Sequence, residues 1–336
     1  MNYCFQLLPH ANIRYQESLN LLGTAELSCI LKALHIESEV QLRTIGGAPF
    51  LCFEAPELTD AQLAQCARHS AVYLICTEEN GLLHPLDCPR GDYLPRDLAE
   101  VLKYKGKTSA VFTHMMINLA LTVSKSFGAG KPITVLDPLC GRGTTLFVAL
   151  QKGMNSVGID MDRRDLKEAA DYLSRYLQYH RLKHKLEQGA RTVKSQSIPD
   201  ALYTLADSKQ AFQAGDTRSL RLLLGDTGAI GALLKKTPAD ILVADLPYGV
   251  QHAPQDGRRP ENFPGMLRRV LPSWKDALKS DAGVAISFNS LTLPRKTLVE
   301  LLEAAGFQVM TETPYSNFEH FVEQAVTRDV VVARKV

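Results

Sequence analysis

The segment at residues 135–144 places the tightest constraint on what this chain can fold into. Its sequence is Val-Leu-Asp-Pro-Leu-Cys-Gly-Arg-Gly-Thr, so a short apolar strand ends in an acid and passes through a glycine turn into a helix. Gly141 and Gly143 let the backbone approach a ligand without a Cβ in the way. The helix N-terminus gathers free N–H groups at the same point. The pattern predicts a strand, a turn and a helix of an α/β sheet, with a ligand bound at the turn.

The acid at the strand tip narrows the choice of ligand. A dinucleotide site carries a third glycine and cradles a pyrophosphate, but the third position here is Leu146. The carboxylate of Asp137 would also repel a pyrophosphate. It suits a ligand with a cationic amino group, such as the methionine end of S-adenosylmethionine. We therefore expect S-adenosylmethionine as the cofactor and disfavour a nicotinamide oxidoreductase.

Two further acids fit the same cofactor. The strand predicted at residues 156–159 ends in Asp160, which lies 23 residues after Asp137. In a βαβ unit, an acid about 20 residues after the glycine turn bonds the ribose hydroxyls. Asp226 directly follows a clear apolar strand, and we expect it to meet the adenine amino group. Asp216 has a similar Gly-Asp-Thr context but no such strand before it, so Asp226 is preferred.

The candidate catalytic residues lie in Ala-Asp-Leu-Pro-Tyr-Gly at residues 244–249, after a strong apolar strand. A nucleobase amine is a poor nucleophile because its lone pair is delocalised into the ring. Asp245 and a nearby backbone carbonyl can accept the amine hydrogens and favour the pyramidal nitrogen that forms as a methyl group arrives. Pro247 would stiffen the turn, and Tyr248 would offer a flat face for base stacking. A plain turn also fits these residues, but the position at a strand end beside the cofactor turn favours catalysis.

The order of predicted elements indicates two domains, at residues 1–95 and 96–336. The first is a smaller N-terminal α/β domain, interpreted as a substrate-recognition module. The second alternates strands and helices in the order of a doubly wound, Rossmann-like α/β sheet with helices on both faces. In the first domain we predict a helix at 25–34, a strand at 49–53, a helix at 59–69 opened by Thr59, a strand at 71–76 and a linker at 87–96. In the second we predict helices at 111–123, 144–151, 164–179 and 295–305, and strands at 133–136, 156–159, 222–224, 241–244, 284–288, 308–312 and 330–333.

The composition is that of an ordinary globular protein, with 336 residues, 45% hydrophobic and 22% charged. No apolar run approaches the ~18 residues that span a bilayer, and residues 1–15 lack the pattern of a secretory signal. We therefore expect a cytoplasmic protein without a membrane partner. The seven cysteines show no C-x-x-C spacing, which argues against a disulfide framework or a zinc site, so no metal is expected.

A net charge of +2 does not by itself indicate nucleic-acid binding. Between residues 172 and 194, however, six Lys and Arg residues accompany the single acid Glu187. This stretch is either a solvated helix end and loop or a surface that contacts phosphates. Arg181, Lys183 and Lys185 are the candidate substrate-binding residues, at the start of a basic insertion near residues 182–220.

The turn DPLCGRGT and the tip DLPYG resemble those of class I methyltransferases with an [N/D]-P-P-[Y/F] motif. The likeness is strongest to the tRNA guanosine-N2 methyltransferase family, including the position-10 and THUMP-containing enzymes, which often carry DPPYG or DLPFG. It covers about residues 103–336, and the N-terminal part resembles the leading domain of that family loosely. Two features depart from the family: Leu246 replaces the commoner proline, and no full THUMP domain is recognisable.

The resemblance implies roles for individual residues. Asp245, Pro247 and Tyr248 are implied to hold the target base. Thr113, which follows Phe112 at the start of an apolar helix, is implied to flank the methionine end of the cofactor. The cofactor-binding set comprises, besides Thr113, the residues Asp137, Pro138, Cys140, Gly141, Gly143, Asp160 and Asp226.

The expected function is methyl transfer from S-adenosylmethionine to the N2 amine of guanosine in tRNA or another structured RNA. RNA is the expected partner, and an activating partner subunit is a further candidate. Adenine-N6 methylation of DNA or RNA and N5 methylation of a protein glutamine would use the same motif. A non-catalytic RNA-binding subunit is a different class of protein. The intact Asp137, Gly141, Gly143 and Asp245 disfavour it, since an inactive pocket has no physical need for them.

Overall fold

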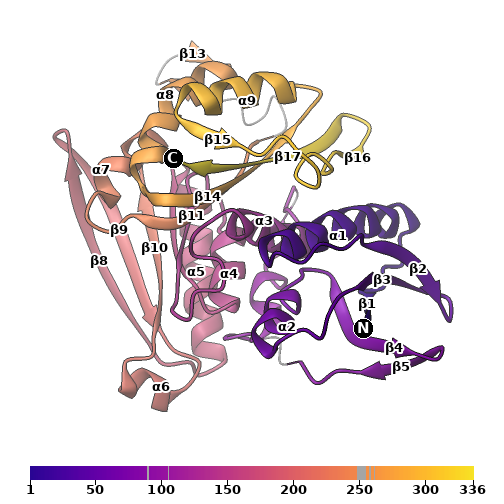
Figure 1. The fold of residues 1–336 in the computed structure, drawn as a ribbon. Coiled ribbons are helices and arrows are strands. Elements are labelled where there is room, and N and C mark those ends of the chain that lie inside the picture. The colour runs from indigo at the N-terminus through magenta and orange to yellow at the C-terminus, as the bar shows by residue number, and fades with distance from the viewer. Residues whose placement is uncertain (89–90, 105, 248–254, 257–258, 261) are drawn as a thin grey trace.

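The computed structural model describes residues 1–88, 91–104, 106–247, 255–256, 259–260 and 262–336. Two large sheets organise this part of the chain, one in the N-terminal region and one in the remainder (Figure 1). None of the described helices is long and apolar enough to cross a membrane.

The N-terminal region is an antiparallel sheet with a hydrophobic core beneath its helices. Its elements are β1 (Asn2–Leu7), α1 (Ile13–Ala33), β2 (Gln41–Ile45), β3 (Ala48–Glu54), α2 (Asp60–Cys66), β4 (Val72–Glu79) and β5 (Leu82–Pro85). The strands lie in the order β2-β3-β1-β4-β5, all antiparallel. Phe5, Leu27 and Phe53 are buried in the core that joins α1 to this sheet.

Three of the N-terminal elements were predicted, namely β3, α2 and β4. Thr59 caps α2 in a capping box, because its hydroxyl accepts the N–H of Gln62 and the Gln62 side chain accepts the N–H of Thr59. The helix predicted at 25–34 is too short, since α1 begins at Ile13, where the Asn12 side chain caps it. Gly23 interrupts the apolar pattern in the sequence, but in the structure it lies inside the helix, against the ring of His69.

The larger sheet contains ten described strands with helices on both faces. Its strands are β6 (Thr134–Asp137), β7 (Asn155–Asp160), β8 (His184–Val193), β9 (Gln196–Leu205), β10 (Arg218–Leu224), β11 (Ala239–Asp245), β14 (Leu278–Asn289), β15 (Phe307–Val309), β16 (His320–Glu323) and β17 (Val326–Lys335). The helices of this part are η1 (Arg96–Ala99), α3 (Ala110–Thr122), α4 (Thr144–Gln151), α5 (Arg163–Tyr179), α6 (Lys209–Ala214), η2 (Thr227–Ala229), α7 (Ile230–Leu234), α8 (Phe263–Asp276) and α9 (Arg295–Ala304). The short strands β12 (Gln255–Asp256) and β13 (Arg259–Pro260) pair only with each other.

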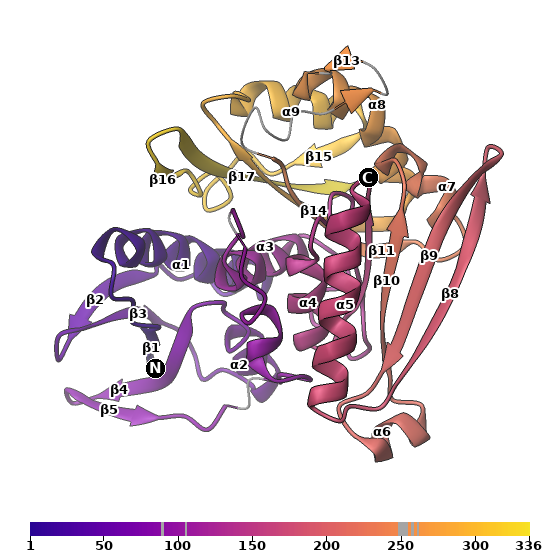
Figure 2. The ribbon, with the colours of Figure 1, turned by 180° about the vertical axis from the view of Figure 1, so that it is seen from behind.

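The strand order confirms the predicted fold class. The sheet runs β15-β17-β14-β11-β6-β7-β10-β9-β8, and β16 pairs with β17. The five central strands, β14 to β10 in this order, are parallel, and the strands at both edges are antiparallel. Helices cover both faces (Figures 1 and 2). This is an α/β sheet of Rossmann-like order, accompanied by a smaller N-terminal α/β region.

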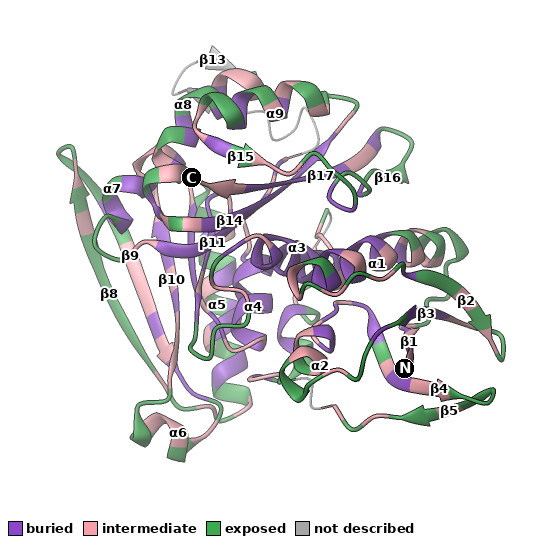
Figure 3. Ribbon diagram, viewed as in Figure 1, coloured by how far each residue is buried: buried purple, intermediate pink, exposed green. Residues whose placement is uncertain are grey.

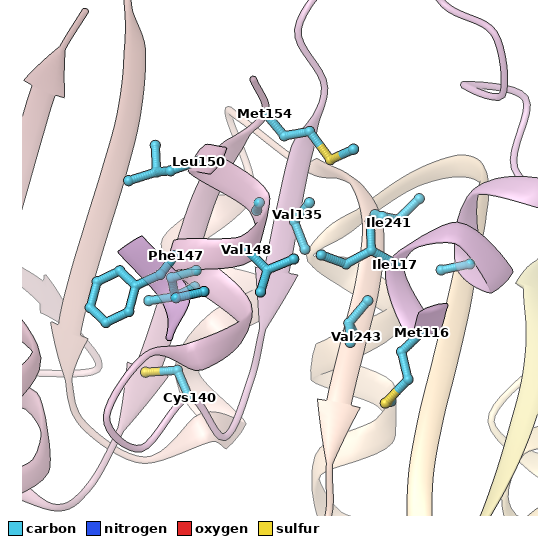
Figure 4. Packing of buried hydrophobic residues seen from close by; sticks show 14 of the residues in the cluster. Met116, Ile117, Val135, Cys140, Phe147, Val148, Leu150, Met154, Ile241 and Val243 are labelled. Atoms are coloured by element: carbon cyan, nitrogen blue, oxygen red, sulfur yellow. The ribbon is translucent and has the colours of Figure 1, made fainter. Parts of the chain in front are cut away.

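Alternate residues of the central strands supply two separate hydrophobic cores. Ile241 and Val243 of β11 pack with α3, α4 and α5 on one face, while Leu242 and Ala244 pack with α7, α8 and α9 on the other. Figure 4 shows the first of these cores, where Met116 and Ile117 of α3 lie beside β11. Leu22, Ala25 and Cys29 of α1 belong to the same core, so the N-terminal region and the larger sheet share hydrophobic packing.

The basic insertion expected near residues 182–220 is an ordered part of the sheet. β8 and β9 form a long antiparallel hairpin that extends the sheet beyond β10, and α6 follows it. Most of β8 is exposed (Figure 3). Because β8 buries no continuous face, its sequence shows no apolar alternation from which a strand could be predicted.

A glycine in β14 sets how closely α3 approaches the sheet. A Cβ at Gly283 would lie 1.7 Å from the carbonyl oxygen of Ala120 in α3. We expect Gly283→Ala to force the helix off the sheet and to lower the free energy of unfolding by about 3 kcal/mol. The melting temperature should then fall by roughly 5–10 °C, measured by circular dichroism. Gly189→Ala in β8 is the matched control, because nothing lies within 4 Å of its Cβ position. An equal loss in both variants would contradict this account.

Candidate active site

Four neighbouring strands end at one edge of the sheet, each at or just before a predicted acid. β11, β6, β7 and β10 lie side by side in that order and run parallel. Asp245, Asp137 and Asp160 are the last residues of the first three strands, and Asp226 follows the fourth. The carboxyl edge of parallel strands is where sheets of this type bind ligands.

A cleft of about 540 Å³ opens at this edge, a size typical of small-molecule sites. Five of the predicted site residues line it: Pro138, Gly141, Asp160, Asp226 and Pro247. Residues that the sequence analysis did not single out complete the lining, among them Met161, Asp162, Asp165, Met266 and Arg269.

The glycine turn has the backbone shape that its sequence predicts. Gly141 and Gly143 both have positive φ, at 47° and 83°, and Gly143 is the N-cap of α4. A third glycine, Gly158 in β7, allows the close packing of the turn, since a Cβ there would lie 2.6 Å from both Cys140 Sγ and Leu146 Cδ1. Position 146 of the helix is a leucine and not a glycine, and the space that its side chain needs is provided by Gly158 on the strand beneath it.

Cys140 turns its side chain away from the cleft. The thiol is buried over Gly158, and burial raises its pKa well above the usual value. Its carbonyl accepts the N–H of Gly143 at 2.7 Å. Any contact between Cys140 and a cofactor would therefore have to use the backbone.

One buried and one half-buried carboxyl group, those of Asp137 and Asp160, lie at the turn without a basic partner in the described chain. Asp137 is 3% exposed and accepts the N–H of Leu139 at 3.0 Å. Burial, together with the nearby charges of Asp160 and Asp245, raises its pKa to about 7, against the hydrogen bonds from Thr145 and Leu139 that lower it. Asp160 accepts the N–H groups of Gly141 at 2.8 Å and Asp162 at 2.9 Å, and burial raises its pKa too. Within the described chain, neither carboxyl forms an ion pair with a Lys, Arg or His side chain, so the site favours a cationic ligand.

Asp226 is held at the far wall of the cleft. It accepts the N–H of Gly228 at 2.6 Å and pairs with Arg269 of α8 at 3.0 Å. Its competitor Asp216 lies before β10, at the opposite edge of the sheet, and pairs there with Arg218 at 2.6 Å. The structure therefore brings Asp226, and not Asp216, to the cleft.

Helix α8 was not predicted from the sequence, although it carries a helical pattern. Its buried residues recur at helical spacing: Met266, Leu267, Val270, Leu271 and Trp274. Two prolines in this stretch argue against a helix in the sequence. Pro264 lies in the first turn, where proline is tolerated, and Pro272 lies inside the helix. The periodicity of the apolar residues was the signal that could have placed Arg269 near the site.

Residues 245–247, which we call the Asp-Leu-Pro corner, are held in place by hydrogen bonds on two sides. The Thr108 hydroxyl donates a hydrogen bond to Asp245 Oδ2. The N–H of Leu246 donates to the carbonyl of Ser287 at 2.9 Å, and the Leu246 side chain is buried in the core below. Pro247 lines the cleft, whereas Tyr248 lies outside the described residues.

The segment before α3 covers the glycine turn and was not predicted to do so. The Tyr104 hydroxyl lies 3.0 Å from Thr144 Oγ1, and the Arg142 guanidinium lies 4.7 Å from the centre of the Tyr104 ring. Arg142 also pairs with Asp165 and with Glu168 of α5, both at 2.9 Å. These contacts fix the turn between α4, α5 and the covering segment.

The remaining predicted residues lie away from the cleft. Thr113 is buried in α3, where its hydroxyl donates to the Ser109 carbonyl at 3.0 Å, and it does not line the cleft. Arg181, Lys183 and Lys185 lie where α5 leads into β8, at the end of the hairpin that pairs with the start of β10. The cleft lies at the other end of β10, so the structure does not bring these basic residues together with the candidate site.

The fold and the cleft define an α/β protein with an acidic ligand site at the carboxyl edge of its sheet. No protein-family model and no curated protein sequence matches the chain. Among solved structures, TrmN from Thermus thermophilus is similar at 18% identity, with 89% of this chain and 60% of that chain covered and a TM-score of 0.40. The rRNA methyltransferase AviRa from Streptomyces viridochromogenes is similar at 17% identity, with 69% and 88% covered and a TM-score of 0.39.

A TehB-like S-adenosylmethionine-dependent methyltransferase from Corynebacterium glutamicum is similar at 15% identity, with 62% of this chain and 83% of that chain covered and a TM-score of 0.36. The chain spans about 60% of the length of TrmN. By their names, these structures include the class of enzyme that the turn and tip motifs resemble.

The raised pKa of Asp137 predicts a pH-dependent stability difference. The folded protein holds this proton more tightly than the unfolded chain, so Asp137 costs stability as the pH rises from about 4 through about 7. Asp137→Asn removes that cost while keeping an acceptor for the Leu139 N–H. We expect the variant to melt roughly 5 °C higher than the parent at pH 8 but not at pH 4.5, measured by scanning calorimetry.

Asp171→Asn on the exposed face of α5 is the control for this experiment, because its side chain is 51% exposed. Its melting temperature should shift by the same small amount at both pH values. A difference for Asp137→Asn that does not change with pH would mean that the carboxyl is charged at low pH and that its burial costs little.

Proposed function

We propose that this chain is an S-adenosylmethionine-dependent methyltransferase whose cofactor occupies the cleft beside Asp137 and Asp160. The observation that carries the proposal is a pair of carboxyl groups, Asp137 buried and Asp160 half-buried, that have no basic partner in the described chain. S-adenosylmethionine carries an ammonium and a sulfonium group, and either positive charge would stabilise ionised carboxylates there. When bound, this cofactor supplies an electrophilic methyl group.

The residues that line the cleft fit the parts of this cofactor. Asp160 accepts one backbone N–H at each of its two oxygens, so lone pairs remain that can accept ribose hydroxyls. Asp226 would accept the adenine amino group, with Arg269 shifting its pairing, since both side chains are 37% exposed. Gly141, without a Cβ, lets the amino-acid end of the cofactor approach the turn.

The substrate that we propose is an exocyclic amine of a nucleobase in RNA. Asp245 is the last residue of β11, which pairs with β6, and so lies next to the glycine turn. Its carboxylate and the carbonyl of Leu246 would accept the two amine hydrogens, which localises the lone pair on nitrogen and aims it at the methyl group. Thr108 fixes the carboxylate orientation, and the bond from Leu246 N–H to Ser287 fixes the peptide.

The sequence resemblance favours guanosine N2 of tRNA or another structured RNA as the target amine. Adenine N6 is the alternative that the same corner would serve. Incubation of bulk RNA with labelled S-adenosylmethionine, followed by nucleoside mass analysis, separates them. We expect label in N2-methylguanosine. Label in N6-methyladenosine would replace the guanosine assignment, and label in protein glutamine would remove RNA as the substrate.

Asp245→Ala tests the catalytic assignment. We expect it to lower kcat for methyl transfer on the order of 100-fold or more, because the carboxylate acts mainly on the transition state. Calorimetric titration should show that S-adenosylmethionine affinity stays within about threefold of the parent. Asp160→Ala is the contrasting variant, in which cofactor affinity should fall. Loss of both functions in Asp245→Ala would show that its role is misassigned, and binding of NADH in place of S-adenosylmethionine would end the proposal.

A further inference from the structure

A second cavity lies between the N-terminal region and the larger sheet. It measures about 300 Å³. Its walls come from four segments: the start of α1, the turn before β4, the start of α3, and β16 with β17. Figures 1 and 2 both show β16 on the same side of the molecule as α1. We call this cavity the interdomain pocket.

A short run of contacts links the interdomain pocket to Asp245. Thr108 donates to Asp245, and the next residue, Ser109, lines the pocket. Ser109 is the N-cap of α3, and its hydroxyl lies 2.9 Å from the Tyr15 hydroxyl of α1. The sheet register agrees, since Asp245 pairs with Ser287 and Arg328 pairs with Asn289, two residues further along β14. The pocket therefore opens beside the Asp-Leu-Pro corner, on the side of β14. The cleft at the carboxyl edge of the sheet, which is the proposed cofactor site, lies on the side of β6.

The lining of the interdomain pocket is aromatic and positively charged. Arg328 lies with its guanidinium carbon 4.6 Å from the centre of the Phe112 ring, and His320 lies 5.5 Å from the same ring, measured between centroids. Tyr15 and Phe321 are 37% and 55% exposed, so two more aromatic rings lie within reach of solvent. Arg14 adds a second guanidinium, and none of the described lining residues is an Asp or Glu.

His320 also offers a directed acceptor. Burial lowers its pKa, so the ring is neutral near pH 7. Its Nδ1 lies 2.9 Å from the Phe318 carbonyl and must donate there, which leaves Nε2 as an acceptor. A ring N–H or amino group of a base could donate to this nitrogen.

We propose that the interdomain pocket receives an unstacked nucleotide of the substrate RNA, with its base against the aromatic rings and its phosphates beside Arg14 and Arg328. This inference rests on the proposed function. Base stacking on aromatic side chains is the usual way in which proteins hold single-stranded RNA. Guanidinium groups bind phosphates through paired hydrogen bonds. An acidic peptide would use the two arginines but would have no need of four rings, and an apolar ligand would have no need of the arginines.

The pocket also accounts better for RNA binding than the basic stretch after α5. Arg181, Lys183 and Lys185 lie at the far edge of the sheet, and Lys185 pairs with Glu187 at 2.7 Å. The residues of the interdomain pocket lie next to the proposed catalytic carboxylate instead. Because the N-terminal region supplies one wall, it would take part directly in choosing the substrate.

The test compares two pocket variants with two matched controls. Tyr15→Ala and Arg14→Ala alter the pocket, while Tyr179→Ala and Arg175→Ala alter the same residue types at the end of α5. We expect each pocket variant to raise the Kd for a short single-stranded RNA on the order of 10-fold, measured by fluorescence anisotropy without cofactor. The controls should leave this Kd unchanged. Affinity for S-adenosylmethionine should stay at the parent value in all four.

A conservative variant separates stacking from positioning. Tyr15→Phe keeps the ring but removes the hydroxyl that contacts Ser109, so we expect RNA binding close to that of the parent. If Tyr15→Phe loses as much affinity as Tyr15→Ala, the residue acts by positioning Ser109 and the stacking proposal is wrong. Melting temperatures of all variants check that each protein is folded.

A crosslinking experiment locates the RNA independently. Single-stranded RNA carrying 4-thiouridine should crosslink to the peptides around Tyr15 and Phe321 upon irradiation. Crosslinks confined to the β8–β9 hairpin would overturn the pocket, even if methyl transfer is observed. Crosslinks in the pocket, combined with no binding of S-adenosylmethionine, would instead overturn the proposed function and leave the nucleotide pocket standing.

Discussion

The candidate site depends on how closely α4 approaches β7. Cys140 and Leu146 pack directly over Gly158, at a distance that leaves no room for a Cβ on the strand. This contact holds the turn against the strand tip, so that Asp160 can accept the Gly141 N–H from the neighbouring strand. Substitution of the strand glycine would lift the turn and separate the groups that are proposed to bind the cofactor. The close packing over Gly158 therefore determines where the carboxyl groups lie relative to the turn.

A buried carboxyl group, that of Glu26, holds the N-terminal region against the larger sheet. Glu26 of α1 is fully buried and accepts hydrogen bonds from the Ser70 N–H at 2.9 Å and from Asn118 of α3 at 2.7 Å. His69 lies 3.5 Å away. A buried polar group requires such partners, so α1 is fixed in its position against α3. The start of α1 carries Tyr15, and the same constraint therefore sets the shape of the interdomain pocket.

The parts of the site that sequence could predict are those whose signal is local. The strand tip at Asp137, the positive φ of Gly141 and the cap of α2 at Thr59 each follow from a few adjacent residues. Contacts across long stretches of chain could not be predicted in this way. The hydrogen bond from Thr108 to Asp245 joins residues 137 positions apart, and no spacing rule relates them. The hairpin β8–β9 was missed for another reason, since an exposed strand has no buried face to impose a period of two on its sequence.

The Asp-Leu-Pro corner lies between two cavities of opposite electrostatic character. On one side the cleft at the carboxyl edge of the sheet is lined by Asp160, Asp162, Asp165 and Asp226, which suit a cationic ligand. On the other side the interdomain pocket carries Arg14 and Arg328 with aromatic rings, which suit a phosphate-bearing base. A ligand of either kind would be repelled from the other cavity, because its charge would match the charge already there. The two reactants would therefore approach Asp245 from opposite sides without competing for one site. Asp245 accepts the Thr108 hydroxyl on one side and ends the strand beside β6 on the other. This carboxylate is therefore where the amine and the methyl group would have to meet.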